Sequence, residues 1–155
     1  MKRRSILLLS AAMLTTSLAL NDAHAKDVGK QVISSPDAPE AIGPYSQAIK
    51  SGKTVYLSGQ IAIDPKTKQL MTNASIEDQT RLALENLKAV LAADGLTMDS
   101  IVSATVFLTD LTDFAKMNEV YATYFKNSPP ARATVEVAHL PRSAKVEISA
   151  IAVHP

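Results

Sequence analysis

The sequence lacks cysteine and tryptophan altogether, and only 5% of its 155 residues are aromatic. Without cysteine the chain can form no disulfide bond, and it has no leader cysteine to carry a lipoprotein anchor. Its three histidines, His24, His139 and His154, stand at no spacing typical of metal ligands. The sequence therefore shows no pattern typical of a metal site, and the stability must come from the core and from assembly.

An excess of charge of one sign is also missing. Residues 26–155 carry 13 basic and 14 acidic side chains, three and one fewer than the whole sequence, so their net charge is −1. They contain no run of Lys and Arg and no stripe in which aromatic and basic residues alternate. Nucleic-acid binding is therefore not expected.

The long apolar run of the sequence lies at its N-terminus. Basic residues 2–4, apolar residues 6–20 and the small-x-small triplet Ala23-His24-Ala25 together have the pattern of a secretory signal peptide. We predict a signal peptide over residues 1–25, cleavage after Ala25, and a periplasmic or secreted protein with no membrane attachment. The alternative is an uncleaved anchor, but the run is shorter than the roughly 20 apolar residues that span a bilayer.

The remaining residues, 26–155, have the length of one domain. Val55 and Leu57 alternate with polar residues, as in a half-buried strand, and an apolar stripe at helical spacing begins after Ser75 and stops at Gly95. Read in this way, the sequence predicts strands at residues 30–34, 46–50, 54–64, 101–108, 133–137 and 145–153, and helices at residues 76–91 and 113–125.

This order of elements predicts an α+β sandwich in which both helices cover one face of the sheet. By alternation, the opposite face should carry a mixture of polar and apolar side chains: Ser58, Gln60, Ser103, Thr105, Arg132, Thr134, Glu147 and Ser149, together with Tyr56, Ile101 and Phe107. Such a face is suited to packing against other copies of the chain, with charged groups in the clefts between them. The alternative is a half-solvated sheet on a monomer.

Four spaced motifs follow one another along the chain. They are Ala-Ile-Gly-Pro-Tyr-Ser-Gln at 41–47, Leu-Ser-Gly-Gln-Ile at 57–61, Pro-Ala-Arg at 130–132 followed by Val-Glu-Val at 135–137, and Val-Glu-Ile at 146–148. In this order they resemble the Rid/YjgF family of reactive-intermediate deaminases. The resemblance implies a chorismate-mutase-like fold, a homotrimer with sites at the subunit clefts, and hydrolysis of 2-aminoacrylate or 2-iminobutanoate to a 2-keto acid and ammonia without a metal or cofactor.

Two residues have the chemistry that this reaction needs. The planar fork of Arg132 can hold a substrate carboxylate through two hydrogen bonds. Glu147 can accept a proton from a water that attacks the C=N carbon, and a nearby Arg132 would favour its ionised form. Structural alternatives remain for both residues: a salt bridge between subunits for Arg132, and a pair with Lys145 or Arg132 for Glu147.

The family resemblance implies five further contacts to the substrate. Tyr45 would form the pocket wall, Ser58 and Asn118 would be polar contacts, and Gly59 would let the backbone approach the ligand because it has no Cβ. Thr134 stands where the best-known deaminases often have cysteine, so reactivity through a thiol is excluded at that position. Ser58 and Asn118 have an alternative reading as structural hydrogen-bonding residues, and Tyr45 as a loop anchor.

The second hypothesis for the function is a binding protein without turnover. A trimer of the same fold could act as a holdase-like or ligand-binding protein through its surface. Ribonuclease activity is disfavoured because a net charge of −1 offers little attraction to phosphate. Substitution of Arg132 separates the two hypotheses, since an enzyme would lose turnover with its assembly intact.

Overall fold

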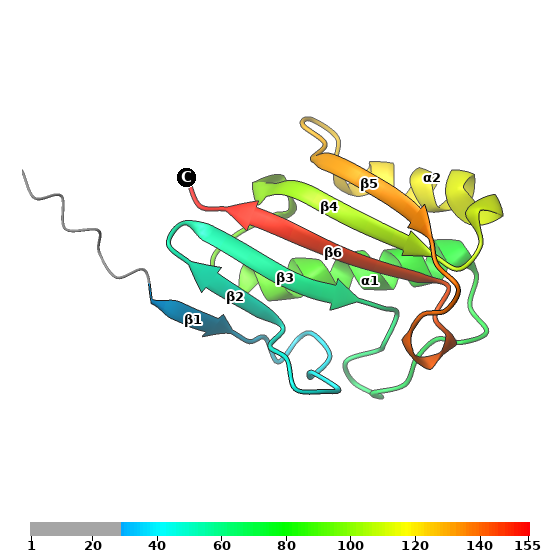
Figure 1. Ribbon diagram of the computed structural model, residues 1–155, viewed down its shortest axis with the longest axis horizontal. Helices are drawn as coiled ribbons and strands as arrows, with labels where there is room; N and C mark the ends of the chain where they lie inside the picture. The colour runs from blue at the N-terminus through cyan, green and yellow to red at the C-terminus, as the bar shows by residue number, and fades with distance from the viewer. Residues whose placement is uncertain (1–28) are drawn as a thin grey trace, which may run out of the picture.

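The computed structural model describes residues 29–155 (Figure 1), so the predicted signal peptide and its cleavage site lie outside the described residues. The strands are β1 (Lys30–Ile33), β2 (Ala48–Ser51), β3 (Thr54–Gln60), β4 (Ile101–Leu108), β5 (Ala131–Glu136) and β6 (Val146–Val153). The helices are α1 (Ile76–Ala92) and α2 (Phe114–Tyr124), with short 3-10 turns at Met98–Ser100, Leu111–Asp113 and Pro141–Ser143. Within residues 29–155 neither helix has the length and apolar character needed to cross a membrane.

The strands form one six-stranded sheet in the order β1-β2-β3-β6-β4-β5. All neighbouring strands are antiparallel except β4 and β5, which run parallel because α2 forms the crossover between them. Both helices lie on the same face of the sheet (Figure 1). The predicted α+β sandwich, with a mixed sheet and two helices on one face, is confirmed.

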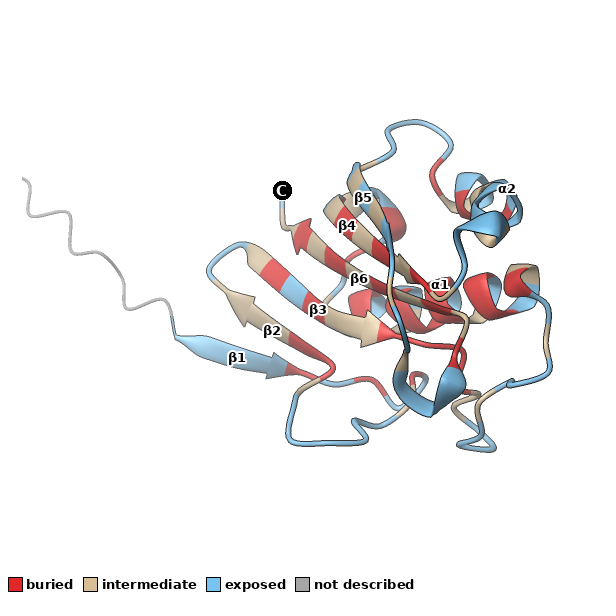
Figure 2. Cartoon of the chain, turned by 45° about the vertical axis from the view of Figure 1, so that its right-hand side comes forward, coloured by how far each residue is buried: buried red, intermediate tan, exposed pale blue. Residues whose placement is uncertain are grey.

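The core lies between this sheet face and the helices (Figure 2). Leu84, Leu87 and Leu91 of α1 are at most 1% exposed and belong to the same buried cluster as Val106 of β4 and Ile148 of β6. The helix begins where the sequence predicts, because the Ser75 hydroxyl caps it by accepting from the Asp78 backbone N–H at 3.1 Å. Past its last turn, Gly95 takes a φ of +70°, which only a glycine adopts at little cost.

Two buried polar side chains of α1 fix the ends of the strands beside it. Asn86 donates to the carbonyl oxygens of Ile61 and Ile63 at 3.2 and 3.0 Å. Gln79 accepts from the Lys145 backbone N–H at 2.9 Å and donates to the Met71 carbonyl at 3.0 Å. These bonds explain why β3 ends at Gln60 and not at residue 64 as predicted: the carbonyls that would extend the ladder bond to the helix.

The prediction that Arg132 and Thr134 face away from the helices is wrong. The parallel register pairs Arg132 with Ala104 and Thr134 with Val106, and both partners are buried against the helices. Residues paired across a sheet point to the same face. Arg132 and Thr134 therefore lie on the helix-covered face, whereas Glu147, which pairs with Phe107, lies on the open face.

Gln60 and Ile101 were also expected on the open face, and both are buried instead. A register shift between Leu57 and Gln60 pairs Gln60 with Ile148 of the core, and a second shift lies between Ile101 and Ser103. A bulge changes the alternation by one residue and so moves the following side chain to the other face. Six of the seven other predicted members do lie on the open face, namely Tyr56, Ser103, Thr105, Phe107, Glu147 and Ser149. The seventh, Ser58, lies within the register shift and has no paired residue on β6.

Candidate functional site

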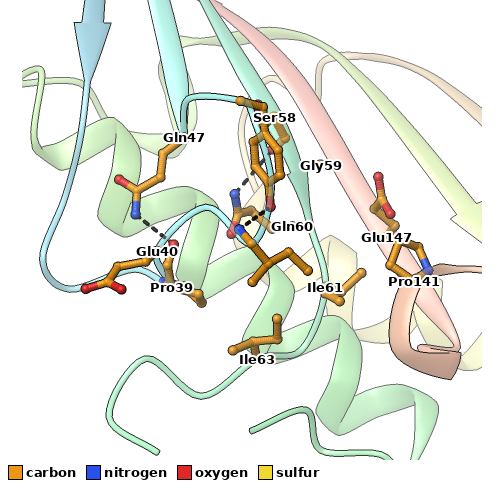
Figure 3. Close-up of a pocket in the computed structure, with 12 residues that line it drawn as sticks. Pro39, Glu40, Gln47, Ser58, Gly59, Gln60, Ile61, Ile63, Pro141 and Glu147 are labelled. Atoms are coloured by element: carbon orange, nitrogen blue, oxygen red, sulfur yellow. Dashed lines mark hydrogen bonds between the residues drawn. The ribbon is translucent and has the colours of Figure 1, made fainter. Parts of the chain in front are cut away.

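A cavity of about 310 Å³ opens where β3 leaves the sheet (Figure 3). Its walls come from the loop before β2, the end of β3, the turn at Pro141 and the side chain of Glu147 on β6. Four of the predicted site residues line it together: Tyr45, Ser58, Gly59 and Glu147.

The Glu147 carboxyl group lies directly over Gly59. A Cβ added at Gly59 would come within 2.7 Å of Glu147 Cδ and 2.9 Å of Cγ, and closer still to Oε1. Glycine is required here because of this close approach, since its backbone is not in the left-handed region. Within this chain Gly59 makes room for Glu147, and its close approach to a ligand stays a prediction.

Within residues 29–155, no group forms a hydrogen bond or an ion pair with the Glu147 carboxylate. Lys145, the structural partner considered above, donates instead to the Ala74 carbonyl at 3.0 Å. Burial raises the pKa of Glu147 above its usual value, because the charged form loses hydration. The expectation that Arg132 would favour ionisation of Glu147 is wrong for the single chain.

Gln47 holds the loop that forms one wall of the cavity. Its side-chain oxygen accepts from the Ser35 backbone N–H at 2.6 Å, and its amide nitrogen donates to the carbonyls of Ser35 and Pro39 at 3.1 and 2.8 Å. This buried side chain was missed at the sequence level. The available signal was a glutamine next to a segment rich in Pro and Gly, whose backbone groups needed partners.

Tyr45 stands at the mouth of the cavity and is 47% exposed. Its hydroxyl accepts a hydrogen bond from the Ile42 backbone N–H at 3.2 Å, so Tyr45 both anchors the loop and forms part of the cavity wall. Ser58 is similarly engaged, since its hydroxyl donates to the Ser46 carbonyl at 2.6 Å. The Ser58 oxygen can then only accept a hydrogen bond from a ligand.

Arg132 lines a second cavity, of about 510 Å³, between α2 and β5. Its guanidinium carbon lies 4.4 Å from the ring centroid of Tyr121 and 5.9 Å from that of Phe114, both on α2. These are cation–π distances, so the rings contribute to holding the guanidinium group beside α2. Asn118 of the same helix lines this cavity, and in the described part of the chain Arg132 has no ion pair.

Two buried hydroxyls near Arg132 have no hydrogen-bond partner within residues 29–155, those of Tyr121 and Thr134. Burial raises the pKa of the Tyr121 hydroxyl, and the positive charge of Arg132 opposes this. The contact between Tyr121 and Arg132 was not predicted from the sequence. Spacing alone could not have shown it, because the contact joins a helix to a strand.

The predicted site residues thus fall into two groups. Tyr45, Ser58, Gly59 and Glu147 form the first half-site, the cavity at the end of β3; Asn118, Thr134 and Arg132 form the second half-site, between α2 and β5. Arg132 and Glu147 stand two strands apart, about 10 Å across the sheet, and on opposite faces. Among residues 29–155, no three acidic, His or Cys side chains cluster as metal ligands would.

Comparison with known proteins gives consistent matches. The family model described as endoribonuclease L-PSP matches residues 35–154. A RutC family protein of Pyrococcus horikoshii is 54% identical over 123 residues, which cover 79% of this chain and 97% of that protein. The 2-iminobutanoate/2-iminopropanoate deaminase of Mus musculus is 48% identical over 124 residues, covering 80% and 91% respectively.

Solved structures match in fold as well as in sequence. The crystal structure of Escherichia coli TdcF with bound serine has a TM-score of 0.77 and 46% identity, and the match covers 81% of this chain and 99% of that one. The fold described above is therefore that of the chorismate-mutase-like YjgF proteins, as the sequence motifs implied.

Proposed function

The chain belongs to the Rid/YjgF family, and we propose that it hydrolyses small 2-imino and 2-enamino acids to 2-keto acids and ammonia. Relatives that match over most of the chain are named deaminases of this kind. The observation that carries the proposal is the Glu147 carboxylate, which lies over Gly59 in the wall of a cavity and has no hydrogen-bond partner among residues 29–155.

Glu147 can move every proton that the reaction requires. It takes one proton from a water whose oxygen bonds to the C=N carbon, and it passes this proton to the nitrogen. It then takes the hydroxyl proton of the resulting carbinolamine and passes it to the amino group, which leaves as ammonia when the C=O bond forms. An enamine enters as its imine tautomer. The raised pKa of Glu147 suits a group that must both accept and return a proton.

Arg132 is proposed to hold the substrate carboxylate. Within one chain it cannot do so for a substrate beside Glu147, because a carboxylate bonded to the C=N carbon spans far less than the separation of the half-sites. We therefore propose that the site forms between copies, as a homotrimer in which the second half-site of one subunit faces the first half-site of its neighbour. The open sheet face, with Tyr56 half exposed, offers surface for this contact.

The proposed activity is tested by keto-acid release from 2-iminobutanoate generated in situ. The assay compares the protein that consists of residues 26–155, its Arg132→Ala variant and an enzyme-free sample. We expect acceleration that is lost in Arg132→Ala with the oligomer intact. Absence of acceleration over the blank, repeated with imines from amino-acid oxidases, would favour the holdase-like or ligand-binding alternative.

The shared site has its own test, in which two inactive variants are unfolded together and reassembled. In an equal mixture of Arg132→Ala and Glu147→Gln, about one site in four would combine both intact half-sites, so about a quarter of the normal activity should return. A site formed within one chain would recover nothing.

Export is a separate proposal that rests on the residues before Lys26. We propose that residues 1–25 direct the chain to the periplasm or the medium and are then removed. Fractionation of producing cells, followed by N-terminal sequencing of the recovered protein, should give a chain that begins at Lys26; an intact Met1 in the cytoplasmic fraction would contradict this.

A further inference from the structure

The first half-site is polar at one end and apolar at the other. From this division we infer that the chain favours imino acids with a longer aliphatic side chain over the smallest ones. The inference rests on the proposed function and specifies the substrate class of the same site.

Two buried isoleucines and one half-exposed isoleucine form the apolar end. Ile61 and Ile63 are 7% and 5% exposed, and Figure 3 shows them between Glu147 and Pro141 on one side and Pro39 on the other. Ile42 lies on the loop opposite and completes this apolar lining.

This wall is fixed in place by hydrogen bonds. The carbonyls of Ile61 and Ile63 accept from Asn86, and the backbone N–H of Ile42 donates to the Tyr45 hydroxyl. A lining that is held in this way cannot collapse around a small substrate. A small substrate would leave water against the isoleucine side chains.

The substrate enters with a fixed orientation. Its carboxylate must point toward Arg132, outside the first half-site, while the C=N carbon lies beside Glu147. The remaining substituent of that carbon, the side chain, then points along the cavity toward Ile61 and Ile63.

The cavity of the single chain has room for a longer side chain. About 310 Å³ corresponds to on the order of ten water molecules at about 30 Å³ each. 2-Aminoacrylate, whose side chain is one carbon, leaves most of this volume unused. Each added methylene that displaces water from the apolar wall should raise kcat/KM about fourfold until the cavity is full.

A cationic side chain is disfavoured even though Glu40 lies at the rim. The Glu40 carboxylate is already 3.2 Å from the Lys68 ammonium, and both side chains are largely exposed. An exposed, paired carboxylate contributes little to the selection of a charged ligand.

The test is a linear substrate series. An amino-acid oxidase generates the imines of alanine, 2-aminobutyrate, norvaline and norleucine, with ornithine as the cationic member. We expect kcat/KM to rise about fourfold per methylene, and the Ile42→Ser variant to lower this slope to about twofold. Val32→Ser is the matched control, because Val32 is 59% exposed and lines neither cavity. Its slope should equal that of the wild type.

Calorimetric affinities of the corresponding 2-keto acids separate the two levels of the proposal. A rise in affinity with chain length supports the side-chain subsite even if turnover is absent. If kcat/KM stays flat or falls with chain length, or is highest for the ornithine-derived imine, the inference is overturned. Acceleration with the alanine-derived imine would still support the deaminase. Absence of both turnover and keto-acid binding overturns both.

Discussion

The close approach of Glu147 to Gly59 makes Gly59→Ala the most informative single substitution. The added methyl group would occupy the space of the Glu147 carboxyl group, whose Cδ lies 2.7 Å from the ideal Cβ position. The backbone of Gly59 is not in the left-handed region, so alanine adds no strain to the main chain. The side chain of Glu147 must therefore rotate away from the cavity.

The cost to stability should be small, because the atoms that collide are the far end of a side chain. A displaced rotamer costs about 1 kcal/mol, and replacement of glycine stabilises by about 0.4–1 kcal/mol through the unfolded chain. The free energy of unfolding should then change by less than about 1 kcal/mol. Catalysis should suffer far more, since a misplaced general base costs about 10²–10⁴-fold in kcat.

Steady-state keto-acid release gives kcat, and urea unfolding gives the stability of the same preparation. Gly43→Ala is the matched control on the loop that includes Ile42 and Tyr45, because its Cβ would meet the Tyr45 ring at an ordinary contact distance of 3.5 Å. A Gly59→Ala enzyme with normal kcat would refute the assignment of Glu147 as the group that moves the protons. If Gly59→Ala does not fold, the claim that rotation of the Glu147 side chain alone relieves the clash would be refuted.

Three further predictions concern charges. Tyr121→Leu removes the aromatic face under Arg132 and should raise KM about tenfold at little change in kcat, whereas Tyr121→Phe keeps the face and should resemble the wild type in steady-state kinetics. Since burial raises the pKa of Glu147, the folded chain binds the carboxyl proton of Glu147 more tightly than the unfolded chain does. Urea unfolding should therefore show that the stability of the wild type falls relative to that of Glu147→Gln as the pH rises above about 4.5. The rate of turnover should rise over the same pH range. At Asp94, burial opposes ionisation, but hydrogen bonds from His154 and Lys50 outweigh burial and lower the pKa. Asp94→Asn should lower the free energy of unfolding by about 2 kcal/mol near neutral pH. Urea unfolding should show this difference disappear as the pH falls through the lowered pKa of Asp94.

The elements themselves could be predicted from short-range signals. The helix predicted at 113–125 is observed as Phe114–Tyr124, and the strand predicted at 145–153 as Val146–Val153. Helical spacing and strand alternation are properties of consecutive residues, so the sequence contains them. β3 was predicted four residues too long because its end depends on Asn86, a residue of another element.

The face to which the side chains of β5 point could not be predicted in the same way. Alternation within β5 was correct, but polarity was used to decide which set faces outward, and Arg132 was placed with the polar residues. Arg132 lies on the helix face because Tyr121 and Phe114 offer aromatic surface for its guanidinium. A charged side chain on the buried side of an edge strand is acceptable where it finds such contacts and an opening to solvent.

The separation of Arg132 from Glu147 within one chain keeps both groups available for the substrate. If the two groups met within one chain, the guanidinium would lower the pKa of the carboxyl and occupy the donors that a substrate carboxylate needs. In the observed arrangement burial raises the pKa of Glu147, and the Arg132 guanidinium lies over the rings of Tyr121 and Phe114. Each half-site therefore retains a charged group that is free to bind substrate. When two copies bring the half-sites together, the substrate carboxylate can bind the Arg132 guanidinium.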